Sequence, residues 1–82
     1  MQIQPGSVVY SKAGHDKGSL FLVLQIENDC VYLADGKLRK LEKPKKKKQK
    51  HLQGTNHVLQ LDETLLSNAG IRKALAQFKP IQ

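Results

Sequence analysis

The chain has one cysteine, no tryptophan and only four other aromatic residues among its 82 residues. A lone cysteine, Cys30, cannot form an intramolecular disulfide or a cysteine-rich zinc site, so we expect it to pack within a strand. The scarcity of aromatic side chains leaves few platforms on which nucleic-acid bases could stack. No apolar run approaches the roughly 18 residues of a membrane span, and the N-terminus has no signal-peptide pattern. We therefore expect a cytoplasmic protein.

Groupings of catalytic or metal-binding side chains are also missing. No Ser/His/Asp or Cys/His set occurs at a recognisable spacing, and GHDKGS, residues 14–19, lacks the spacing of a P-loop. The histidines at positions 15, 51 and 57 are scattered and lack the partners of a zinc site. We expect a protein that is not an enzyme and that uses no metal, no cofactor and no small-molecule substrate.

Positive charge is plentiful but concentrated in one segment. The net charge is +7, from 14 basic and 7 acidic residues. Residues 36–51 hold nine basic residues and one acidic residue, whereas residues 1–35 carry a net charge of −2. Such a patch attracts a polyanion. Because lysine is a point charge without the planar fork of arginine, twelve lysines against two arginines favour phosphate contacts over contacts with base edges.

The four consecutive lysines at residues 45–48, called here the lysine run, are by themselves compatible with a solvated loop, a nuclear localisation signal or a binding site for anionic lipid. Its position inside the chain, after an Asp35-Gly36 turn, predicts that it is held against a folded body. Pro44 keeps Lys43 extended and prevents a helix there. The run contains no apolar residue that could insert into a bilayer, so we expect no membrane partner.

Short apolar runs rich in β-branched and aromatic residues predict a meander of strands at residues 7–12, 20–26, 30–34 and 37–41. Residues 20–26 are almost continuously apolar, which is typical of a strand covered on both faces. For a fifth strand, residues 51–53 and 57–61 are equal candidates.

The C-terminal third changes to helical periodicity. Ile71, Leu75 and Phe78 share one face of a helix predicted over residues 69–79, within a helical segment at 62–79. Ser67 or Asn68 can cap its start, Lys79 suits its last turn and Pro80 marks its end. The fold class we expect is mainly β, with this helix packed on the strands.

The stretch PGSVVYSKAGHDKGSLFLVLQIENDCVYLADG, residues 5–36, resembles a KOW motif. Gly18 lies where the family carries its glycine at the start of the second strand, and Gly6, Val8, Gly14 and Lys17 fit the pattern. The basic extension over residues 37–53 resembles that of short bacterial KOW-domain RNA-binding proteins, which are similar to ribosomal large-subunit proteins of archaea and eukaryotes. The resemblance implies a small SH3-like β-barrel, with residues 1–82 forming a single domain.

The resemblance also implies which residues face RNA. Lys12, His15 and Lys17 would point toward RNA, while Gly14 and Gly18 let the backbone approach phosphates. His15 stands where Arg or Lys is more frequent, and Asp16 brings a negative charge, so we expect the lysine run to contribute more than this loop. The predicted RNA-binding residues are Lys12, Gly14, His15, Lys17, Gly18, Arg39, Lys40, Lys43, Lys45, Lys46, Lys47, Lys48, Lys50 and His51.

These observations predict an RNA-binding protein that contacts structured, ribosomal RNA through phosphates and is associated with the ribosome or translation. Ribosomal RNA, with ribosomal proteins beside it, is the expected partner. The alternative is an SH3-like protein-interaction module acting in transcription or translation complexes. The shortage of aromatics counts against a groove for proline-rich peptides.

Overall fold

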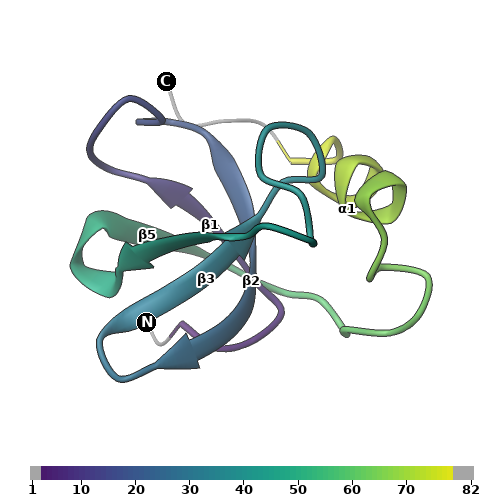
Figure 1. Ribbon diagram of the computed structural model, residues 1–82, viewed down its shortest axis with the longest axis horizontal. Helices are drawn as coiled ribbons and strands as arrows, with labels where there is room; N and C mark the ends of the chain where they lie inside the picture. Colours follow the sequence, from purple (N-terminus) through teal and green to yellow (C-terminus); the bar gives the residue numbers. More distant parts are fainter. Residues whose placement is uncertain (1–2, 79–82) are drawn as a thin grey trace.

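The structure is a computed structural model that describes residues 3–78, and its strands form one antiparallel sheet (Figure 1). The strand order is β4-β3-β2-β1-β5, with no ladder between β4 and β5 in residues 3–78, so the sheet is not closed into a barrel. No helix within these residues is long and apolar enough to cross a membrane. The elements are β1 (Ser7–Ser11), β2 (Leu20–Glu27), β3 (Cys30–Ala34), β4 (Lys45–Lys48), the 3-10 helix η1 (Gln49–His51), β5 (Leu52–Val58) and α1 (Asn68–Leu75).

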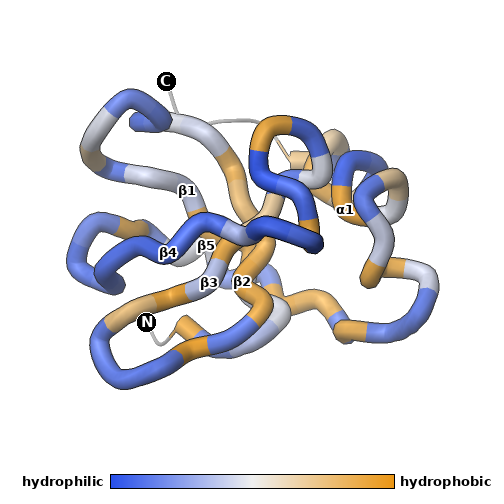
Figure 2. Tube along the Cα trace, viewed as in Figure 1, coloured by the Kyte–Doolittle hydropathy of each residue, from blue (hydrophilic) through white to orange (hydrophobic). Residues whose placement is uncertain are grey.

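The sheet buries apolar side chains on both of its faces. One cluster includes Val8 and Leu22, and it is covered by Ile71 and Leu75 of α1. The other cluster, on the opposite face, consists of Val9, Phe21, Val23, Val31, Leu33 and Leu52. Strand β2 contributes to both clusters, which confirms that its continuous apolar run is covered on both sides. In the hydropathy colouring, β2 is largely hydrophobic, whereas β4, at the edge of the sheet, is a hydrophilic segment (Figure 2).

The prediction of a strand at residues 37–41 is wrong, and the lysine run itself forms the fourth strand. The Asp35 carboxylate accepts hydrogen bonds from the backbone N–H of Lys37 and of Arg39, at 2.8 and 2.9 Å. These bonds close a compact loop, because a short side chain of this kind competes with a strand ladder for backbone donors. The backbone N–H of Leu41 is also taken, by Asn68 Oδ1 at 2.9 Å.

The observed bounds of β5 and α1 differ slightly from the predicted ones. Strand β5 covers the candidate at 51–53 except for its first residue and continues to the start of the other candidate. Helix α1 ends at Leu75 and not at 79, and its Ser67 cap is confirmed, since Ser67 Oγ accepts a hydrogen bond from the N–H of Gly70. The predicted roles of Lys79 and Pro80 lie outside the described residues.

Candidate functional site

The four lysines of β4 alternate between the two faces of the strand. Lys46 and Lys48 are exposed, whereas the side chains of Lys45 and Lys47 keep only 23% and 10% of their accessible surface. Successive side chains of a strand point to opposite faces. Lys45 lies opposite Leu33 and Lys47 opposite Val31, so the inner lysines share a face with buried core residues of β3. The lysine run is therefore two pairs with different surroundings.

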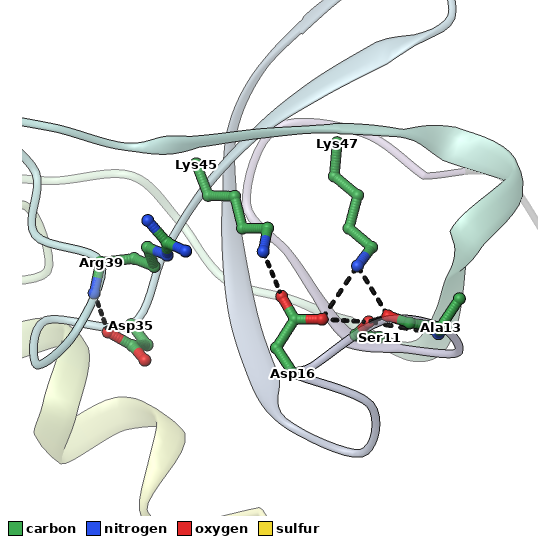
Figure 3. A network of polar contacts seen from close by, with 7 residues as sticks. All are labelled: Ser11, Ala13, Asp16, Asp35, Arg39, Lys45 and Lys47. Carbon is green, nitrogen blue, oxygen red and sulfur yellow. Dashed lines mark hydrogen bonds and ion pairs between the residues drawn. The ribbon is translucent and has the colours of Figure 1, made fainter.

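The inner lysines are paired with Asp16, which lies in the loop between β1 and β2 (Figure 3). Lys45 Nζ lies 2.8 Å from Asp16 Oδ2, and Lys47 Nζ lies 2.9 Å from Asp16 Oδ1. Lys47 also donates to the carbonyl oxygen of Ala13 at 2.8 Å, and Ser11 Oγ donates to Asp16 Oδ1 at 2.8 Å. One carboxylate thus pairs with two ammonium groups, which leaves one positive charge in excess, and it fastens the loop to β4.

The surroundings of Asp16 favour its ionised form. Partial burial by itself would raise the pKa of this carboxyl, but hydrogen bonds from Lys45, Lys47 and Ser11 outweigh it. The pKa of Asp16 is consequently held well below its ordinary value of 3.8. The ion pairs are therefore intact at neutral pH.

Asp16→Asn is expected to lower the free energy of unfolding by about 2 kcal/mol at pH 7, because two partly buried lysines lose their counter-charge. The folded-state pKa of Asp16 is depressed, so its contribution is complete above the unfolded-chain pKa of about 3.9 and is lost progressively as the pH falls from there toward the folded-state pKa. The stability difference between the wild type and the variant should therefore become smaller in acid, although part of it remains at pH 3. Urea unfolding at pH 7 and at about pH 3 measures this.

Glu63→Gln is the matched control, since Glu63 is exposed and lies outside both ion pairs. It should unfold like the wild type at both pH values. Equal stability of Asp16→Asn and the wild type at pH 7 would contradict the structural role of the Asp16 pairs.

The outer face of β4 carries ammonium groups that no described carboxylate neutralises. Both ion pairs found within residues 3–78 involve Asp16, and neither includes Lys46 or Lys48. Lys46 Nζ lies 5.8 Å from the centre of the Tyr32 ring, a cation–π distance, and the Tyr32 hydroxyl donates to Glu27 at 3.2 Å. Lys50 follows on η1 and is exposed.

The loop between β1 and β2, which contains Gly14 and Gly18, contacts both β4 and η1. Gly14 and Gly18 have φ values of +86° and +89°, a region that favours glycine. The Gly18 N–H donates to Ser11 at 2.8 Å, and the Lys12 N–H donates to the carbonyl of His51 at 2.8 Å. Lys12, His15 and Lys17 are exposed around this loop. The predicted loop residues and the lysine run are therefore brought together, although about 30 positions separate them in the sequence.

The other predicted residues, Arg39, Lys40 and Lys43, lie in the loop that leads into β4 and are exposed. This loop is tied to α1, because the Asn68 amide donates to both carboxylate oxygens of Glu42, at 2.9 and 3.0 Å. The hydrogen bond from Asn68 lowers the pKa of Glu42.

Sequence reasoning missed Asp16 and Ser11 as the residues that organise the site. From the sequence alone, Asp16 is expected to weaken a basic loop, whereas in the structure it anchors two lysines. The available signal is a single carboxylate within a loop that is otherwise expected to be basic. Residues 3–78 contain no group of three or more His, Cys, Asp or Glu side chains placed to hold a metal ion.

Neither a protein-family model nor a curated protein matches this chain.

Proposed function

We propose that the protein binds structured RNA through its phosphates and acts on the ribosome or in translation. The observation that carries this proposal is the sorting of charge on β4. Asp16 is paired with both inner lysines, whereas Lys46 and Lys48 remain exposed on the outer face, followed by Lys50. Because Asp16 is engaged with the inner lysines, the ammonium groups of Lys46 and Lys48 remain available to a polyanion.

The strand also sets the spacing of these charges. Alternate residues of a strand lie roughly 6.6 Å apart, so Lys46 and Lys48 form a fixed pair along the edge of the sheet. This separation is comparable to that of neighbouring phosphates along a nucleic-acid strand. An ordered row of cations loses less conformational freedom on binding than a disordered tail. The arrangement supports recognition of RNA by its backbone and shape.

We further propose that this RNA-binding protein is a KOW domain with an SH3-like arrangement of strands. It is supported by the meander of short antiparallel strands, by the return of β5 to pair with β1, and by η1, which connects the two edge strands β4 and β5. The positive φ of Gly18 just before β2 agrees with the position of the family's glycine.

The alternative of a peptide-binding module receives less support. A groove for proline-rich ligands needs exposed aromatic side chains. Tyr10 and Tyr32 are only half-exposed, and the ring of Tyr32 lies beneath the ammonium group of Lys46. Phe21 is buried in the core.

The salt dependence of RNA binding tests the proposal. If the five exposed lysines at positions 12, 17, 46, 48 and 50 each meet a phosphate, log K should fall against log salt with a slope of roughly −3.5 to −4.5. Fluorescence anisotropy with a labelled ribosomal RNA hairpin measures this slope. A slope near zero would contradict binding through phosphates.

A further inference from the structure

Leu38 is the most exposed large apolar side chain of residues 3–78. It keeps 89% of its accessible surface, compared with 51% for Val58 and 42% for Leu66. It lies in the loop of residues 36–43, which joins β3 to β4 and stands beside α1 (Figure 1). A leucine displayed to this extent contributes almost nothing to the core, so its presence calls for another explanation.

The loop that carries Leu38 is fixed on both sides. Asp35 accepts hydrogen bonds from the N–H groups on either side of Leu38, at 2.8 and 2.9 Å, and the carbonyl of Arg39 accepts from Asp35 and Gly36. The Arg72 guanidinium donates to the carbonyl of Gly36 at 2.8 Å, which holds the loop to α1. The leucine is therefore presented outward by an ordered turn, and little freedom remains to be lost on binding.

The surroundings of Leu38 are cationic. Lys37, Arg39 and Lys40 flank it and are all exposed, and Lys43 and Pro44 lead directly from this loop into β4. The tip of this loop, residues 37–40, therefore combines one apolar side chain with three positive charges. The chain continues from it into β4, whose outer lysines are proposed to bind phosphates. Its ligand should place a small apolar surface among negative charges. A nucleotide whose base is out of the helical stack has this chemistry.

We propose that Leu38 packs against an unpaired base of the bound RNA while its cationic neighbours contact the flanking phosphates. This inference rests on the proposed function and names the feature of RNA that the protein distinguishes. Bulges and loops offer unstacked bases to proteins, and leucine is among the side chains that wedge against bases. With few exposed aromatics, an aliphatic tip takes the place of a stacking ring. A membrane is the poorer ligand, because insertion needs a larger apolar area than one leucine.

The test compares two RNA hairpins, one with a fully paired stem and one with the same stem carrying a single bulged uridine. The wild type should bind the bulged hairpin about fivefold to twentyfold more tightly, and Leu38→Ser should remove most of that preference. Leu66→Ser is the matched control, because it also removes an exposed leucine and lies outside the cationic loop. Melting temperatures establish that each variant is folded.

The outcomes separate this inference from the proposed function. An equal affinity of the wild type for both hairpins, with a steep salt dependence, overturns the role of Leu38 and leaves phosphate binding intact. A loss of affinity for phosphatidylserine vesicles in Leu38→Ser, with no change on either RNA, assigns the tip to a membrane and overturns the inference. Absence of binding to both hairpins by the wild type overturns both proposals.

Discussion

Replacing Lys46 and Lys48 together by glutamine is expected to weaken binding to structured RNA by about tenfold to a hundredfold at low salt. Each exposed ammonium group that meets a phosphate contributes a charge-assisted contact and releases a counterion. The slope of log K against log salt should become shallower by about 1.4 to 1.8. Stability should fall by less than about 1 kcal/mol, since neither side chain takes part in an ion pair within the described chain and only the exposed contact of Lys46 with the Tyr32 ring is lost.

The matched control is the double replacement of Lys45 and Lys47 by glutamine. It lowers the net charge from +7 by the same amount, so long-range attraction to RNA changes equally. Its main effect should be on stability, because Asp16 is left as an unpaired, partly buried carboxylate. RNA binding and urea unfolding of both double variants distinguish the two pairs. Equal losses of RNA affinity in the two variants would contradict the sorting of charge between the faces of β4.

Gly36→Ala is expected to lower the free energy of unfolding by about 3 kcal/mol, a large part of the stability of so small a domain. Gly36 has a φ of +80°, and a Cβ atom there would collide with the carbonyl oxygen of Asn68 and approach the backbone nitrogen of Arg72 to 3.2 Å. Both atoms belong to the backbone of α1, so neither can move without displacing the helix from the sheet. Thermal and urea unfolding measure the effect.

Gly14→Ala is the control for the backbone conformation alone. Gly14 has a similar φ of +86°, but an added Cβ would meet only the ends of the Lys47 and Asp16 side chains, at 3.5 and 3.7 Å. Its cost should be about 1 kcal/mol, the penalty of a left-handed conformation. The difference between the two variants isolates the contact of the loop with α1. If both cost the same, close packing at Gly36 is not what holds the loop in place.

The parts of the fold set by local patterns could be predicted from the sequence. The apolar run of β2, the alternation in β3 and the helical stripe of Ile71 and Leu75 each follow from a period that the chain displays. The cap at Ser67 follows from the preference of helix starts for a side-chain oxygen. These features needed no knowledge of distant contacts.

The organisation of the candidate site depends on contacts that no local pattern reveals. Four consecutive lysines have little tendency to form a strand, and β4 exists because β3 offers a free edge to pair with. Which lysines face inward is decided by that register. Asp16 meets Lys47 across 31 positions of sequence. Charges that face inward on an edge strand also protect the edge from pairing with another chain, so the same residues serve the fold.

Binding to ribosomal RNA is tested by mapping protein–RNA crosslinks in the cells that make this protein, together with a ribosome sedimentation profile from the same lysate. We expect one dominant site in ribosomal RNA, cofractionation with a ribosomal subunit, and crosslinked peptides that contain Lys46, Lys48 or Lys50. Recovery of no RNA, with the protein at the top of the gradient, would contradict this expectation and leave the outer lysines of β4 without a nucleic-acid partner.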